Sequence, residues 1–192
     1  DIGKFIQKVL DGKVEPSIKS EPVPETQEGP VTVIVAHSYK ELVIDNEKDV
    51  LVEFYARGVA TAKREFPNDL ISRVLLIVER LAPKYEELGA LYTGDLASKV
   101  TIAKIDATAN DVPDSITGFP TIRLFAAGAK DEPVEYTGSR TVEDLANFIK
   151  EKGTHKVDGL AAAASKKAEE GESAAADDKD EAVHDELKLG VL

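Results

Sequence analysis

Two ionisable side chains interrupt segments that are otherwise apolar. Glu53 lies within residues 50–55 and Lys104 within residues 100–105, and both segments are short and rich in β-branched residues, as strands are. Buried acidic and basic groups have shifted pKa values and can move protons, so a buried acid–base pair is one interpretation. In the other, each side chain simply points to the edge of its sheet. The sequence leaves both interpretations open.

Composition excludes several other kinds of chemistry. The chain has no Cys, which rules out disulfides, thiolate nucleophiles and cysteine-ligated zinc. Its three His lie far apart in the sequence, which favours isolated histidines over a metal site. We therefore expect no cofactor and no bound metal. The net charge of -12 argues against a nucleic-acid partner and against an anionic membrane surface, and no apolar run is long enough to span a bilayer.

The segments that must position Glu53 and Lys104 alternate between two types. Strands are expected near 31–36, 50–55, 100–105, 121–125 and 134–136, and helices near 38–43, 70–92 and 141–153. Strands and helices that alternate in this way predict an α/β fold: a central mixed sheet flanked by helices. The first three strands should be parallel and the last two antiparallel.

The remaining segments suggest how the chain is organised. Residues 1–12 read as the end of a preceding domain, 13–30 as a proline-rich linker, 31–155 as the folded domain and 156–192 as an acidic, disordered tail. The sequence favours a solvating role for this tail, with weak calcium binding by its clustered carboxylates as the alternative. Because the chain contains no Met, we expect Asp1 not to be a natural start and the chain to be a fragment.

Several motifs in this order resemble a known family. They are DVLVEFYA at 49–56, LAPKYEEL at 81–88, VTIAKIDAT at 100–108, GFPTI at 118–122, Arg140, and the retention tetrapeptide His184-Asp185-Glu186-Leu187. Together they resemble the C-terminal catalytic domain of fungal-type protein disulfide isomerases, over nearly the whole chain. The resemblance implies a thioredoxin-like fold in the endoplasmic-reticulum lumen, and partners that are unfolded or disulfide-containing polypeptides.

The resemblance also implies roles for single residues. Glu53 would accept a proton, Lys104 would be its partner, Arg140 would tune the second thiol, and Phe119-Pro120 would hold the substrate backbone. In the family the strand continues into Ala-Pro-Trp-Cys-Gly-His-Cys-Lys, in which the first thiolate attacks and the second resolves the mixed disulfide. Val59 and Ala62 occupy the slots of these two cysteines. The chain as it stands therefore lacks the nucleophile.

The replaced residues are related to the family motif by a change of reading frame. Loss of one nucleotide in the proline codon lets the shifted codons encode Arg and then Gly, Val, Ala, Thr and Ala, the residues found at 57–62. Residues 64–80 then form an insertion before the second helix. A retained intron, or compensating sequencing errors around an insertion, would explain both features, and the five residues that follow the tetrapeptide fit a lost stop codon.

Three hypotheses follow from this sequence. The first is an endoplasmic-reticulum disulfide isomerase whose Cys-Gly-His-Cys site is lost in this chain, which is therefore inactive. The second is a redox-dead thioredoxin-fold module, with a genuine inserted helical turn, that binds polypeptides as a chaperone does. In the third, the insertion prevents stable folding.

Overall fold

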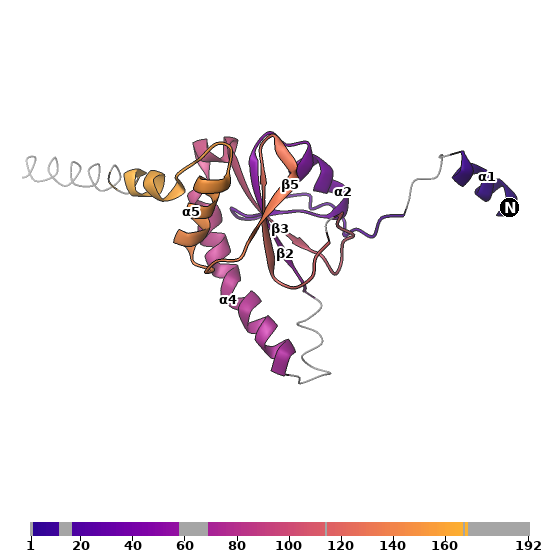
Figure 1. The fold of residues 1–192 in the computed structure, drawn as a ribbon, viewed down its shortest axis with the longest axis horizontal. Helices are drawn as coiled ribbons and strands as arrows, with labels where there is room; N and C mark the ends of the chain where they lie inside the picture. Colours follow the sequence, from indigo (N-terminus) through magenta and orange to yellow (C-terminus); the bar gives the residue numbers. More distant parts are fainter. Residues whose placement is uncertain (1, 12–16, 58–68, 114, 167, 169–192) are drawn as a thin grey trace, which may run out of the picture.

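A mixed β-sheet forms the centre of the molecule (Figure 1). The computed structural model describes residues 2–11, 17–57, 69–113, 115–166 and 168, and within them the sheet has five strands in the order β1-β3-β2-β4-β5. β1, β3 and β2 run parallel, whereas β4 is antiparallel to β2 and β5 to β4, as the sequence predicts. The strands are β1 Thr32–Val33, β2 Asp49–Tyr55, β3 Val100–Asp106, β4 Thr121–Ala126 and β5 Ala129–Tyr136.

Helices cover both faces of this sheet (Figure 1). α4 and α5 pack on one face, and α2 with the π-helical turn η1 packs on the other. α4 is continuous across Pro83 and begins inside the segment 64–80 that the sequence marks as an insertion. The helices are α1 Ile2–Leu10, α2 Ala36–Tyr39, η1 Lys40–Ile44, α4 Asp69–Leu91, the 3-10 helix η2 Gly94–Ser98 and α5 Val142–Lys152.

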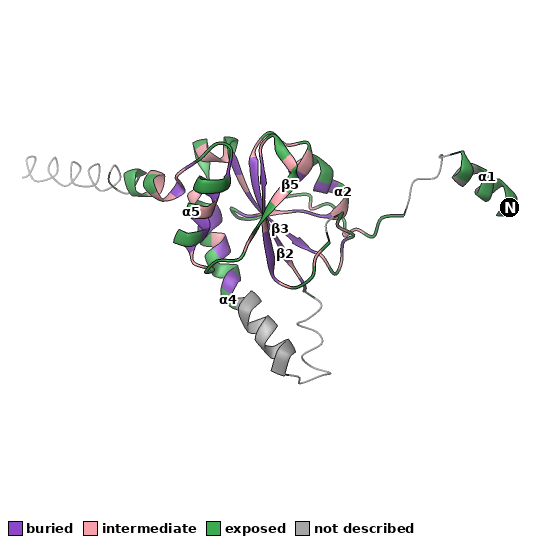
Figure 2. Ribbon diagram, in the orientation of Figure 1, coloured by how far each residue is buried: buried purple, intermediate pink, exposed green. Residues whose placement is uncertain are grey.

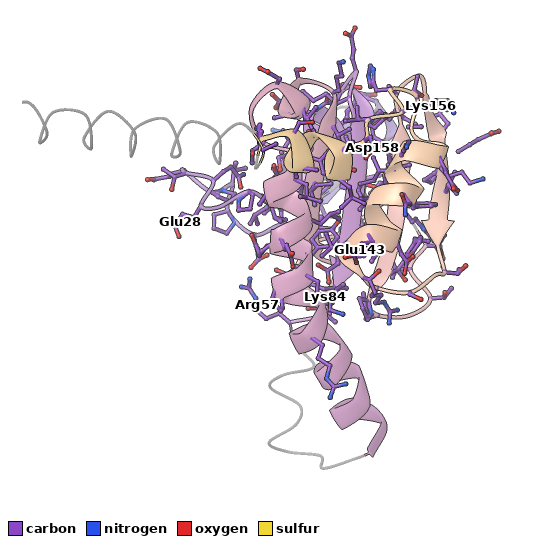
Figure 3. The ribbon with its side chains drawn as sticks, turned by 90° about the vertical axis from the view of Figure 1, so that its left-hand side faces the viewer. Glu28, Arg57, Lys84, Glu143, Lys156 and Asp158 are labelled. Carbon is purple, nitrogen blue, oxygen red and sulfur yellow. The ribbon has the colours of Figure 1, made fainter. Side chains whose placement is uncertain are left out.

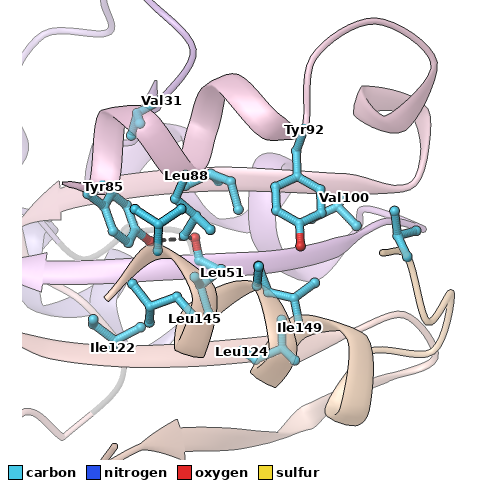
Figure 4. Close-up of a cluster of buried hydrophobic side chains, with 14 of the residues drawn as sticks. Val31, Leu51, Tyr85, Leu88, Tyr92, Val100, Ile122, Leu124, Leu145 and Ile149 are labelled. Carbon is cyan, nitrogen blue, oxygen red and sulfur yellow. Dashed lines mark hydrogen bonds between the residues drawn. The ribbon is translucent and has the colours of Figure 1, made fainter. Parts of the chain in front are cut away.

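The larger core cluster lies between the sheet and the pair α4 and α5 (Figure 4). Leu81, Tyr85 and Leu88 recur at helical spacing, so one face of α4 is apolar and buried against β2 and β3. The Tyr85 hydroxyl donates to the carbonyls of Leu51 at 3.1 Å and Ala103 at 3.0 Å. Burial of each such side chain contributes about 1.5–3 kcal/mol, so this cluster anchors α4 over the sheet.

The second cluster lies on the opposite face, under α2 and η1. Alternate residues of β2 (Val50, Val52 and Phe54) point into it, while Leu51 points into the first cluster. Figure 2 shows the central strands as buried. β2 is therefore covered on both faces, which explains why its sequence is almost continuously apolar.

Asp49 ties the start of β2 to two other parts of the chain. Its carboxylate is fully buried and accepts hydrogen bonds from the backbone N–H groups of Ala127 at 2.8 Å, Thr154 at 3.0 Å and His155 at 2.8 Å. A Cβ at Gly153 would approach Asp49 Oδ2 to 2.7 Å, so this turn fits closely around the carboxylate. Asp49 thus joins β2 to the β4–β5 turn and to the end of α5.

Residues 17–30 lie against the domain, whereas the sequence suggests a plain linker over 13–30. The Lys19 N–H donates to the Asp111 carboxylate at 2.7 Å, and the Asp111 N–H donates to the Lys19 carbonyl at 2.7 Å. The buried Asn110 side chain accepts from the N–H of Glu21 at 3.0 Å and of Ala36 at 3.1 Å. Farther along, the Gln27 side chain bonds both the N–H and the C=O of Val33 on β1. The composition of residues 17–30 does not predict this docking. The hydrogen bonds that hold the segment are made to backbone groups or to residues that are distant in the sequence.

Replacement of Asn110 with Ala tests this docking. Two N–H groups would lose their acceptor, so we expect a loss of about 2 kcal/mol in the free energy of unfolding. Protease cleavage within residues 17–30 should accelerate as well. The variant Asn46→Ala, which removes only local side-chain bonds to the Leu42 carbonyl and the Lys48 N–H, is the control. Equal cleavage rates in the two variants would contradict the assignment.

Ordered structure also continues past residue 156, where the sequence predicts a disordered tail to begin. Residues 159–166 are helical, Val157 is buried, and Leu160 packs against the larger cluster. Lys150 pairs with Asp158 at 2.7 Å, and Asp158 caps the helix through the N–H of Ala161. These few anchors hold a segment whose composition alone would favour disorder.

Candidate functional site

Glu53 is buried at the centre of the sheet, near the end of β2. Only 4% of its surface is exposed, and it lies in register with Lys104 on β3 and Ile122 on β4. Burial raises the pKa of Glu53 from 4.5 to about 7, while the charges of Lys104 and Arg140 oppose this rise. A carboxyl group with such a pKa can take up or release a proton near neutral pH.

Lys104 makes its ion pair with a residue that the sequence did not single out. Its Nζ lies 2.7 Å from Oε1 of Glu86 on α4, and its side chain is 29% exposed. Neither interpretation describes both residues, since Lys104 lies on the inner strand β3 and pairs with Glu86 rather than with Glu53. Glu53 is buried, and Lys104 reaches a partly exposed partner. Lys104 still influences Glu53, because its charge is the largest influence that lowers the pKa of Glu53.

Pro120 and Arg140 lie at the same end of the sheet. The Phe119–Pro120 peptide is cis, and Pro120 is buried at the start of β4. The Arg140 guanidinium donates a long hydrogen bond of 3.5 Å to the Pro120 carbonyl. Its charge also reaches Glu53. The structure therefore brings Glu53, Lys104, Pro120 and Arg140 together where β2 and β3 end and β4 begins.

Phe119 lies on the outer side of this loop. It is partly exposed and lines a hollow of about 430 Å³ whose other walls come from the segment after β3. Val112 and Ile116 give this hollow apolar walls, whereas Asn110 and Asp111 make it polar at one side. The hollow thus lies directly beside the buried Pro120 and has both apolar and polar walls.

Arg57 is the last described residue before residues 58–68. It extends over the Tyr55 ring and donates to the Tyr55 hydroxyl at 3.1 Å. Its backbone N–H points to Asp106 Oδ1 at 3.4 Å, and its guanidinium lies 4.0 Å from the other oxygen of that carboxylate. These contacts fix the end of β2 at the point where the family places its active site.

Other predicted residues lie outside the described part of the chain. These are Val59 and Ala62, the two cysteine slots, and the tetrapeptide His184-Asp185-Glu186-Leu187 with the acidic run before it. Among the described residues, no group of three or more His, Asp or Glu is placed to hold a metal ion. No helix in the same residues is long and apolar enough to cross a membrane.

Comparison with known proteins identifies the family. The Thioredoxin family model matches residues 78–151. Protein disulfide-isomerase of Aspergillus niger is 62% identical over 201 residues, which cover 97% of this chain and 36% of that protein. The Humicola insolens protein disulfide-isomerase is 55% identical over 174 residues, with 90% and 30% covered. The chain belongs to the protein disulfide-isomerase family. It spans about a third of the length of these curated relatives.

Solved structures give a weaker likeness. The J-Trx1 fragment of ERdj5 has a TM-score of 0.47 at 18% identity, and covers 64% of this chain and 51% of its own. Zinc-bound human ERp44 has a TM-score of 0.46 at 22% identity, with 63% and 31% covered. The membership in the protein disulfide-isomerase family rests on the sequence matches and on the family model.

Proposed function

We propose that this chain derives from a disulfide isomerase whose catalytic loop is interrupted between residues 57 and 80. In its present form it would not exchange disulfides, because no thiol is available to attack. The observation that carries the proposal is Glu53, a buried carboxyl group whose pKa lies near 7 at the end of the strand that leads into the lost motif. Burial of a carboxyl group at this position lowers the stability of the fold. Its proposed function is to transfer protons for a neighbouring thiol pair.

Two further observations support an interruption rather than a site of another kind. The Thioredoxin model matches from residue 78 onward and leaves out β2, although β2 is the central strand of the sheet. The residues before 57 and after 80 nevertheless build one continuous sheet and core. The domain is therefore complete on both sides of the segment that differs from the family motif.

The compartment and the substrates belong to the same proposal. The tetrapeptide at 184–187 and the curated relatives point to the endoplasmic-reticulum lumen. Unfolded or disulfide-containing polypeptides would be the substrates, held at Phe119 and Pro120, and Arg140 would act on the second thiol. Weak calcium binding by the acidic run 169–181 stays a separate expectation, which titration calorimetry can measure.

Restoration of the thiols tests this proposal. The variant carries Val59→Cys and Ala62→Cys and lacks residues 64–80, and we expect it to reactivate scrambled ribonuclease, whereas the unmodified chain does not. The same deletion with Val59→Ser and Ala62→Ser is the matched control, since it keeps the shortened loop without thiols. A folded cysteine variant that performs no better than the serine variant would refute the proposal.

A second function is favoured by the intact surface around Pro120. Because the cis-proline loop and the Phe119 hollow are formed in the chain as it stands, the domain is able to bind extended polypeptides without any redox step. Binding of a labelled unfolded peptide by the unmodified chain, weakened by Phe119→Ser, would support this function. Binding that is unaffected by this substitution would place the peptide elsewhere.

A further inference from the structure

A basic hollow lies between α4 and the loop that precedes α5. Its volume is about 290 Å³, and it is lined by Arg80, Leu81, Lys84, Gly138, Ser139 and Arg140. Figure 3 shows Lys84 on the side of α4 that faces the start of α5, whereas Arg57 lies on the other side of the helix in this view. Half of the lining residues are cations, in a chain whose net charge is -12.

The cations of this hollow differ from the other basic residues near them. Lys104 pairs with Glu86, and Arg123 pairs with Glu135. Within the described residues, Arg80 and Lys84 have no carboxylate within ion-pair distance, and Arg140 contacts the Pro120 carbonyl. Arg80 and Lys84 therefore add to the charge of Arg140, which also acts on Glu53, and the positive potential of the hollow attracts an anion.

Arg140 connects this hollow to the proposed polypeptide-binding surface. Its guanidinium lines the hollow and also reaches the Pro120 carbonyl. Leu81, which is almost fully buried, also lines the hollow, so a side chain that enters it meets an apolar group as well as charged ones. This combination suits Glu or Asp in a polypeptide better than a free inorganic anion, which has no apolar part.

We propose that the hollow of Arg80, Lys84 and Arg140 binds an acidic residue of a polypeptide that lies against Pro120. This proposal rests on the proposed polypeptide-binding function. It gives the substrate class of that function as extended segments with acidic residues. The proposed acidic selectivity depends on Arg80, a residue of the inserted segment. This selectivity is therefore a property of this chain in particular.

The experiment measures binding of two fluorescent peptides to the unmodified chain by anisotropy. The peptides are identical except that one carries two Glu where the other carries Gln. We expect the Glu peptide to bind about tenfold more tightly at low salt, because charge-assisted hydrogen bonds replace neutral ones. The variant Arg80→Glu/Lys84→Glu should abolish this preference. The variant Lys99→Glu/Lys152→Glu, with the same net charge at distant exposed positions, should keep it.

Each outcome decides between distinct explanations. Equal binding of both peptides would overturn the acidic selectivity and leave the polypeptide-binding function standing, whereas no binding of either would overturn both. A preference that appears only after removal of residues 169–192 would assign the hollow to the chain's own acidic tail. Full displacement of the Glu peptide by inorganic phosphate at equal concentration would make it a general anion site. Both of the last results contradict the proposal.

Discussion

Replacing Glu53 with Gln is expected to stabilise the domain by roughly 3 kcal/mol at pH 8 but by only about 1 kcal/mol at pH 5. Burial raises the pKa of Glu53 from 4.5 to about 7. The folded state therefore holds this proton more tightly than the unfolded state does. Protonation of Glu53 contributes stability that is fully present below pH 4.5 and is lost as the pH rises to about 7. Gln keeps the neutral form at every pH.

Urea unfolding at the two pH values measures this effect. Because other groups titrate in the same interval, the informative quantity is the difference between Glu53→Gln and the unmodified chain at each pH. Glu87→Gln, at an exposed position on α4, is the matched control and should change stability by less than about 0.5 kcal/mol at either pH. Destabilisation of the same size at both pH values would show that Glu53 is held as a carboxylate.

Replacing Asp49 with Ala is expected to cost about 4 kcal/mol of stability. Three backbone N–H groups now donate to this buried carboxylate, and the substitution would remove their shared acceptor and leave an empty space at its site. Lys130 would lose a nearby negative charge as well. Burial lowers the pKa of Lys130 to about 8, and Asp49 opposes that change, so the pKa of Lys130 should fall further in the variant.

Thermal and urea unfolding of Asp49→Ala, with Asp45→Ala as the control, would measure the loss. Asp45 is exposed and has only a distant ion pair with Lys40, at 3.9 Å. Hydrogen exchange adds a second measurement, since the amides of Ala127, Thr154 and His155 should lose protection together. Loss of protection at only one of these amides would mean that the three segments are not joined through Asp49.

Sequence patterns predicted the strands and helices that are specified by the residues within them. Residues 50–55 and 100–105 are apolar on both faces, as strands in the middle of a sheet must be, and both strands were predicted to within one residue. Thr141 was expected near the start of the last helix, and its hydroxyl accepts from the Asp144 N–H. The first strand is shorter than predicted, because the chain already turns into α2 at Ala36.

Contacts between distant segments could not be predicted in the same way. Glu86 and Glu87 are equivalent in the sequence, and only the rotation of α4 over the sheet, fixed by Leu81, Tyr85 and Leu88, turns Glu86 toward Lys104. The basic hollow likewise needs α4 and the loop before α5 to be placed side by side. The roles of the candidate residues came from resemblance, since Glu53 alone was equally consistent with a solvated edge position.

The pairing of Gln27 with β1 bears on how the two edges of the sheet are protected. β1 is an edge strand, and the Gln27 amide occupies both the donor and the acceptor of Val33. The other edge, β5, carries Pro133 and the charges of Asp131, Glu132 and Glu135. The Gln27 amide at one border, and Pro133 with the charged residues at the other, both disfavour the addition of a further strand. Both features oppose edge-to-edge aggregation of the sheet.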